Sequence, residues 1–408
     1  MKTYLVVVAS GAIASIAMIA GLGACASDDT TAVADPPDVL DEPSSDAGPG
    51  TEPDRDAEVA LCSDCEYFPT ECSDDSLCPN GPFDQSDPSA GLDWRSRVNT
   101  IRGRSSTDVW VAGALGALAH FDGTAWKRSV PGANDSMRAL WLRGPAEILL
   151  TTMDIVHTRG LAIEDAGVDA GAPSVDGWTT RQAYISSGSY DRNSPTSAWA
   201  AEGAEWLWAT TRTTNISSST GIWRMHFVES AQRFEFAAVP YGACESLGCS
   251  SLTSVHGTSA NDVWAVGAFG AALYITDADG PAPVFKAYNT QTSNVLNGVW
   301  AAAQNDVWAV GQGGVIRHYT GDPVVWDIVT DVPTTDSLNA IWGASPSDIW
   351  AVGDKGVALH YDGSGWTRMK VAGLDGARRP DLTAVWMPSP GHVWIGGVGI
   401  VLSLGGKP

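Results

Sequence analysis

The stretch LNAIWGASPSDIWAVGDKGVALHYDGSGW, residues 338–366, contains short apolar runs separated by turn residues. Its runs alternate apolar and polar positions or are rich in β-branched and aromatic residues, which is typical of strands. Pro346, Gly356 and Gly363 lie in the intervening segments, where proline and glycine favour turns. The stretch therefore predicts four short antiparallel strands, A to D in chain order, with strand D beginning at Trp366.

The same pattern recurs along the chain at residues 98–126, 252–276 and 296–326, and a truncated copy ends the chain at residues 382–404. The Trp in strand B recurs at spacings of 44, 42 and 44 residues, at Trp264, Trp308, Trp350 and Trp394. A four-strand repeat of this period is typical of a β-propeller blade. Two less regular units, beginning at residues 138 and 196, raise the number of predicted blades to seven.

The last unit ends after strand C and lacks a strand D. The sequence Gly91-Leu92-Asp93-Trp94-Arg95 resembles the start of strand D at residues 365–368. We therefore predict an all-β, seven-bladed propeller over residues 91–408, whose last blade is closed by an N-terminal strand around Trp94.

The N-terminus has the features of an export signal. Lys2 precedes an apolar run of signal-peptide length, and Leu22-Gly23-Ala24-Cys25 resembles the lipobox of bacterial lipoproteins. The resemblance implies a signal peptide over residues 1–24 and a lipid on the thiol of Cys25. Because Ala26 rather than Asp follows this cysteine, it also implies the outer membrane or the cell surface.

Residues 25–60 predict a disordered, acidic tether, because they are rich in Asp, Pro, Thr, Ala and Glu without apolar periodicity. Residues 26–93 contain 19 acidic residues and one basic residue, whereas residues 94–408 have a net charge of -6. The net charge of the chain, -23, is therefore mostly a property of its N-terminal part. This balance argues against nucleic acid as a partner.

Residues 61–90 predict a small Cys-rich segment before the propeller. Disulfides are expected because six cysteines follow Cys25 in a chain that is predicted to be exported. They are Cys62, Cys65, Cys72, Cys78, Cys244 and Cys249. Zinc bound by the first four is the alternative. Their uneven spacing favours disulfides, and we expect no metal or other cofactor.

Two polar residue types recur in the repeat. Histidine recurs in strand C, at His120, His157, His226, His318 and His360; aspartate recurs before the strand-B Trp, at Asp108, Asp262, Asp306 and Asp348. Strand C lies about 10 Å outside strand A in each blade, so these histidines diverge and predict structural hydrogen bonds rather than a metal site. The aspartates predict turn caps, with a calcium site as the alternative.

The repeat as a whole, W-G-x-S-x-x-D-V-W-A-V-G-x-x-G-x-x-x-H-Y-D-G-x-x-W, is similar to repeats of exported bacterial lipoproteins with an Asp-box-like (BNR-like) or photosystem-assembly-factor-like propeller. This resemblance covers residues 92–408 and implies a binding platform. Asp122-Gly123-Thr124-Ala125-Trp126 resembles an Asp-box, but its Asp-to-Trp spacing is one residue short. No hydrolase or phosphate-loop motif is present.

Ligand binding is expected at the channel mouth formed by the B–C turns and D–A connections. Five candidate residues lie at the B–C tips: Leu115, Phe269, Gln312, Asp354 and Lys355. Arg102 and His256 are two more, because they replace the Trp of strand A; the alternative is neutral drift. We expect a non-catalytic platform, anchored to the membrane by its N-terminal lipid, for a protein or glycan. A glycan-cleaving, sialidase-like enzyme and a structural component of an envelope assembly are the alternatives.

Overall fold

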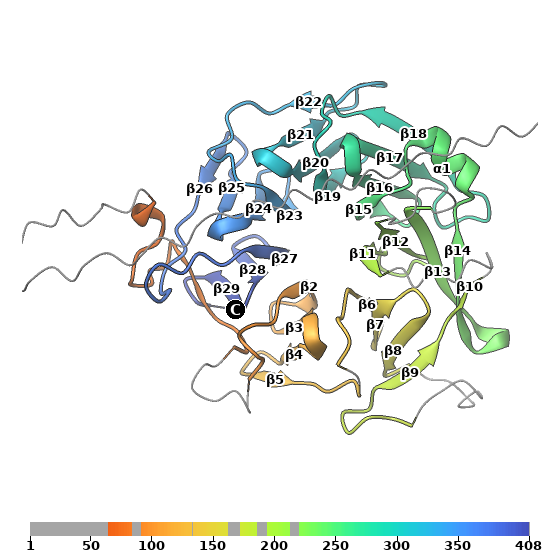
Figure 1. The fold of residues 1–408 in the computed structure, drawn as a ribbon, viewed down its shortest axis with the longest axis horizontal. Coiled ribbons are helices and arrows are strands. Elements are labelled where there is room, and N and C mark those ends of the chain that lie inside the picture. Colours follow the sequence, from red (N-terminus) through yellow and green to blue (C-terminus); the bar gives the residue numbers. More distant parts are fainter. Residues whose placement is uncertain are drawn as a thin grey trace, which may run out of the picture. The chain divides into compact units, whose positions relative to one another are not determined.

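The computed structural model describes residues 64–83, 91–132, 134–161, 172–185, 194–212 and 220–407. Ala60–Pro408 forms one compact unit. Its seven sheets are arranged side by side around a central axis (Figure 1). The predicted seven-bladed β-propeller is therefore confirmed, and α1 (Tyr241–Leu247) is the one α-helix of the described residues.

Blades 1, 4, 5 and 6, numbered in chain order, follow the predicted A-to-D pattern of antiparallel strands. Blade 1 contains β2 (Val98–Ser105), β3 (Asp108–Gly113), β4 (Leu118–Phe121) and β5 (Trp126–Arg128). Blade 4 contains β15 (Leu252–Ser259), β16 (Asp262–Gly267), β17 (Ala271–Thr276) and β18 (Val284–Asn289). Blade 5 contains β19 (Leu296–Ala303), β20 (Asp306–Gly311), β21 (Ile316–Tyr319) and β22 (Asp327–Ile328). Blade 6 contains β23 (Leu338–Ser345), β24 (Asp348–Gly353), β25 (Ala358–Tyr361) and β26 (Trp366–Arg368).

Blades 2 and 3 are built from the two less regular units. Blade 2 contains β6 (Ala139–Arg143), β7 (Ala146–Thr152), β8 (Ile155–Arg159) and β9 (Thr179–Gln182). Blade 3 contains β11 (Pro195–Trp199), β12 (Leu207–Thr211), β13 (Ile222–Val228) and β14 (Arg233–Ala238). A fifth strand, β10 (Tyr184–Ile185), pairs in parallel with β14.

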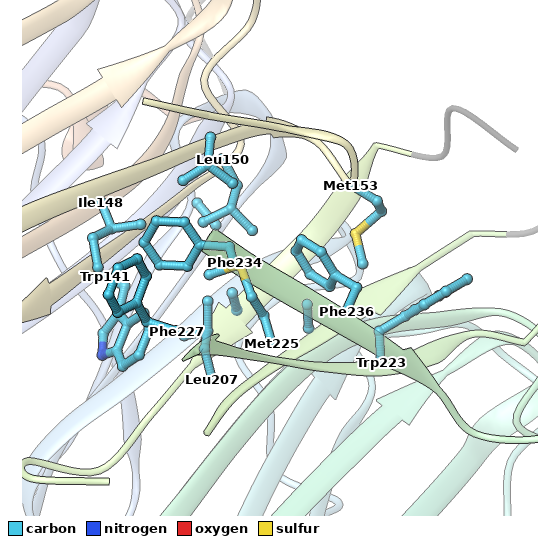
Figure 2. Packing of buried hydrophobic residues seen from close by; sticks show 14 residues of the cluster. Trp141, Ile148, Leu150, Met153, Leu207, Trp223, Met225, Phe227, Phe234 and Phe236 are labelled. Carbon is cyan, nitrogen blue, oxygen red and sulfur yellow. The ribbon is translucent and has the colours of Figure 1, made fainter. Parts of the chain in front are cut away.

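A continuous hydrophobic cluster joins blades 2 and 3 although their sequences have lost most of the repeat. Phe234 and Phe236 extend from blade 3 into the same cluster as Leu150 and Met153 of blade 2 (Figure 2). Trp141 lies at one side of this cluster. Apolar burial of this kind does not need the repeat itself: β7 and β12 are buried along almost their whole length.

Blade 7 is completed by a strand from the N-terminal side, but not by the strand that the sequence predicts. It contains β27 (Leu382–Ser389), β28 (His392–Gly397), β29 (Ile400–Leu404) and, outermost, β1 (Leu77–Pro79). Leu77 pairs with Leu404 and is fully buried. Trp94 lies in no strand and is 52% exposed, so the prediction that it closes the ring is wrong. The Asp93 carboxylate accepts hydrogen bonds from the backbone and side chain of Arg95, and this local turn competes with strand pairing.

The Cys-rich segment therefore belongs in part to the propeller, which corrects the expected boundary at residue 91. Besides β1, its residues contact the connection after blade 6: Leu77 donates to the carbonyl of Lys370, and Val371 donates to the carbonyl of Tyr67. Residues 1–63, with Cys25 and Cys62, lie outside the described residues. In the part of the chain that the structure describes, no helix is long and apolar enough to cross a membrane.

The B–C turns of the four regular blades share one conformation. Each is a short 3-10 turn: η2 (Ala114–Gly116), η4 (Ala268–Gly270), η5 (Gln312–Gly314) and η6 (Asp354–Gly356). Two further 3-10 turns are η1 (Cys65–Tyr67) and η3 (Glu229–Ala231). The repeat therefore sets the frame of each tip and leaves its central side chain variable.

Candidate functional site

The predicted tip residues lie on four different blades, and the structure does not bring them together. Leu115 and Phe269 are 66% and 87% exposed, and both have a positive φ, which is uncommon for residues other than glycine. Gln312 is also exposed. Asp354 accepts a hydrogen bond from Asn339, and the Lys355 ammonium lies 2.7 Å from the Asp336 carboxylate. These residues therefore form separate local features rather than one surface.

The Trp of strand A packs against the next blade, and glycine makes this possible. A Cβ at Gly103, Gly257 or Gly343 would lie 2.6 Å from the indole of Trp386, Trp199 or Trp300 in the preceding blade. Three inter-blade junctions are therefore built from a Trp placed directly on the backbone of a glycine.

Trp342 occupies the same position in blade 6 but behaves differently. The next blade has Met387, which is buried, where the receiving blades have glycine. The Trp342 ring instead lies near the axis, 4.6 Å from the Arg102 guanidinium and 4.8 Å from the His256 ring. The two predicted residues from blades 1 and 4 therefore meet on one tryptophan from blade 6.

His256 is held neutral in this arrangement. Its side chain is buried, and its Nδ1 accepts a hydrogen bond from the backbone N–H of Ala301 at 3.1 Å. Burial, together with the nearby charge of Arg102, lowers the pKa of His256 to about 3. A neutral imidazole that accepts at Nδ1 carries its proton on Nε2, so the other ring nitrogen is a donor.

Arg102 stays charged at neutral pH despite its position. Burial lowers the pKa of its guanidinium to about 10. Its Nη1 donates to the carbonyl of Ile101 at 2.8 Å, and no carboxylate forms an ion pair with it among the described residues. The guanidinium is therefore a positive charge near the axis that is partly desolvated and has no anionic partner there.

Neighbouring A strands are joined near their first residues by a repeated hydrogen bond. The second residue of strand A donates to a carbonyl at the start of the next blade in six junctions, from Asn99, Thr196, Thr253, Asn297, Asn339 and Thr383. Arg138 occupies this position in blade 2, and no such bond to blade 3 is present in the described residues. Its side chain is exposed at the axial cavity instead.

Two cavities meet at Arg102 and Trp342. A small cavity of about 90 Å³ is lined by the beginnings of the A strands, including Asn99, Arg138 and His256. A larger cavity of about 910 Å³ is lined by the ends of the A strands of blades 1 to 3 and by the turns that follow them. Arg102 and Trp342 contribute to the walls of both. The larger cavity thus lies towards the A–B turns, the end opposite the expected mouth.

The wall of the large cavity combines aromatic and aliphatic side chains with charged ones. Its apolar residues include Leu140, Trp141, Trp199, Leu207, Phe227 and Trp342. The Arg143 guanidinium lies 5.7 Å from the Trp141 ring and also lines the cavity. Arg104 is held by Asp108 and Glu147, whereas Glu202, Glu205 and Glu229 are exposed. The interior thus offers apolar surface and cationic groups, while acidic groups lie towards solvent.

Three of the five repeated histidines make one common structural hydrogen bond, as expected. His120, His318 and His360 each place Nε2 within 2.7–2.9 Å of the aspartate before the strand-B Trp of their own blade. Tyr274 makes the equivalent bond to Asp262 in blade 4. The predicted role of these aspartates as turn caps is therefore corrected, because their main partner is a side chain of strand C. No cluster of metal-binding side chains occurs within the described ranges.

The cysteines of the described residues are paired. Cys72 is bonded to Cys78, and Cys244 to Cys249. Cys65 is also in a disulfide. The prediction of disulfides is confirmed for these five residues, and Cys78 of the first bridge belongs to β1, the strand that closes the ring.

Comparison with known proteins supports the fold. No protein-family model and no curated protein matches this sequence. A structure described as YCF48 from Cyanidioschyzon merolae has a TM-score of 0.56 and 14% identity, covering 77% of this chain and 97% of its own. A structure of YCF48 bound to D1 peptide has a TM-score of 0.53 and 15% identity, covering 76% and 92%.

An enzyme shares the fold equally well. A catalytically inactive virginiamycin B lyase from Staphylococcus aureus with quinupristin has a TM-score of 0.56 and 12% identity, covering 77% of this chain and 96% of its own. At such identities the similarities show a propeller and nothing finer. They include both a lyase and a peptide-bound protein, so function has to be argued from the site.

Proposed function

We propose that this protein is a lipid-anchored, extracytoplasmic propeller that binds a protein or glycan ligand without converting it. The large cavity carries the proposal. A concave site of this size, lined by aromatic and aliphatic side chains together with a few charged groups, is typical of ligand binding. It is reached through the A–B turns of blades 1 to 3, rather than through the B–C tips.

The charge arrangement favours binding over glycan cleavage. A glycosidase needs two carboxyl groups on either side of the bond that breaks, one of them acting as a general acid. The glutamates that line the cavity are exposed, whereas Arg102 and Arg143 are partly buried beside its aromatic side chains. The interior is therefore suited to holding a ligand, and the catalytic alternative has less support.

The proposed anchor rests on the N-terminal sequence. The lipobox-like Leu22–Cys25 and the acidic residues that follow would hold the propeller at the end of a tether of about 35 residues. A ligand in the envelope or at the cell surface would then be the accessible one. The peptide-bound YCF48 structure shows that a propeller of similar fold can hold a peptide.

The test is direct binding by the full chain. Glycan and peptide arrays should retain the wild-type protein on a defined subset of ligands, and mass spectrometry should recover those ligands unchanged. Arg143→Ala should weaken the retention, because it removes a cation from the cavity wall. Arg128→Ala, an exposed arginine on β5, is the matched control and should not. Ligand turnover, or retention that is indifferent to Arg143, would contradict the proposal.

A further inference from the structure

The donors of Arg102 are mostly unused by the protein. A guanidinium has five N–H groups in a planar fork. In the described residues one of its nitrogens donates to Ile101, and the face of the group lies on Trp342. Stacking of this kind fixes the plane of the guanidinium and leaves its edge for another partner. The edge of Arg102 is therefore oriented before any ligand arrives.

The groups around Arg102 reinforce its preference for an anion. Arg138 and His256 line the same small cavity, and the neutral ring of His256, which accepts at Nδ1, carries its donor at Nε2. The other residues of that cavity are uncharged, and none is Asp or Glu. Two positive charges and a neutral donor thus share a site that contains no acidic side chain.

The large cavity limits the kind of anion that fits. The body of the ligand would lie against Trp199 and Trp342, which are only partly buried, and this favours an aromatic or aliphatic group. Glu202, Glu205 and Glu229 line the same cavity and disfavour a ligand with several negative charges. A single carboxylate on an apolar group satisfies both conditions.

We propose that Arg102 binds the carboxylate of an apolar acid whose body occupies the large cavity, as the C-terminal residue of a peptide would. The proposal rests on the proposed function, because it names the ligand class of the same site. A free aromatic acid has the same chemistry as a peptide C-terminus. Carboxylate recognition by a planar guanidinium is bidentate and directional, so the corresponding amide should bind poorly.

The experiment compares acid and amide on the full chain. N-acetyl-phenylalanine and N-acetyl-phenylalanine amide are titrated by calorimetry and by tryptophan fluorescence, which reports on the rings around Arg102. The wild-type protein should bind the acid at least about tenfold more tightly than the amide. Arg102→Gln should abolish this preference, and Arg102→Lys should keep only part of it. Arg128→Gln is the matched control and should behave as wild type.

A second readout keeps the test independent of how the variants fold. The acid, but not the amide, should raise the melting temperature of the wild-type protein. Equal binding of acid and amide by the wild type would overturn the proposal, as would an Arg102→Gln protein that melts like wild type and still prefers the acid. Benzoate and a hexapeptide that ends in phenylalanine distinguish a free aromatic acid from a peptide C-terminus as the ligand. If the ligand is a peptide C-terminus, the hexapeptide should bind more tightly than benzoate.

The outcomes also separate this proposal from the proposed function. Arg102-dependent binding of the acid, with no ligand retained on either array, would support the carboxylate site and count against the platform. Array ligands whose binding is unchanged in Arg102→Gln would support the platform and overturn the carboxylate site.

Discussion

The tryptophan of strand B is buried in every regular blade. Trp350 is 3% exposed and packs in a cluster that spans blades 6 and 7. His360 lies with its ring 4.7 Å away and is itself bonded to Asp348, which also accepts from the Trp350 indole at 3.2 Å. One side chain thus links strand B, strand C and the neighbouring blade.

Trp350→Ala should lower the free energy of unfolding by about 3–5 kcal/mol, the range for removing a large buried aromatic side chain. Denaturant unfolding followed by circular dichroism measures this change. Trp94→Ala is the matched control, because Trp94 is half exposed and lies outside every strand, and it should cost much less. Equal losses for the two variants would contradict the buried role of Trp350.

His256 should make stability depend on pH. Its pKa is lowered to about 3 in the folded protein, whereas an unfolded histidine titrates near 6.5. Between these values the unfolded chain binds a proton that the folded chain does not, so stability falls as pH drops through this window. The loss attributable to His256 should be up to about 3 kcal/mol at pH 4. His256→Gln should lessen the difference in unfolding free energy between pH 7.5 and pH 4; an unchanged difference would refute this.

Repeat comparison identified Arg102 and His256 but not their common partner, and the reason is physical. Both differ from the consensus Trp, so they are visible in the sequence. Trp342 matches the consensus and looks like any packing residue. Its different position follows from Met387 in the next blade, which lacks the glycine that would accept the ring. Met387 therefore lies 45 positions away in the sequence from Trp342, the residue whose position it affects.

At the scale of the strand, the Trp side chain of one blade packs where the neighbouring blade has a glycine. Trp300 of β19 lies on Gly343 of β23, and the same fit joins blades 3 to 4 and 7 to 1. Close packing of this kind leaves no space for an added methyl group.

Gly343→Ala should therefore destabilise the protein by about 1–3 kcal/mol, the range for overpacking a filled core. Its Cβ would lie 2.6 Å from the Trp300 ring. Gly365→Ala is the matched control, because nothing lies within 4 Å of its added Cβ. The midpoint of denaturant unfolding should fall for the first variant and stay near wild type for the second. A wild-type midpoint for Gly343→Ala would show that this junction can relax.

At the scale of the whole molecule, the number of blades and their strand order follow from sequence periodicity, but the closing strand does not. Residues 91–95 share a Trp and an Arg with strand D, whereas Leu77–Pro79 has neither residue of that signature. Its place depends on pairing with β29 and on the disulfide beside it, both of which are tertiary. The sequence does not predict the large cavity either, because this cavity forms where the two least regular blades meet the axis.

The proposed lipid anchor gives a prediction for the full chain. Cys25→Ser should move the exported chain from the membrane fraction to the soluble fraction, because the thiol would carry the lipid. Thr30→Ala, a change in the adjacent tether, should leave it with the membranes. Fractionation followed by immunoblotting measures both. Retention of Cys25→Ser in the membrane fraction would exclude a lipid on this cysteine.

Leu77 and Leu404 pair although 327 residues separate them. β1 is the first strand of the described residues and its partner β29 is the last, so β1 has no sheet to join until the strands of the other six blades are also present. An unpaired edge can add to the wrong neighbour during that interval. Pro79 removes one backbone donor from the strand, and the Cys72–Cys78 bridge encloses most of it in a small loop. These two features would disfavour pairing of β1 with a wrong strand, so that β1 is still unpaired when β29 becomes available.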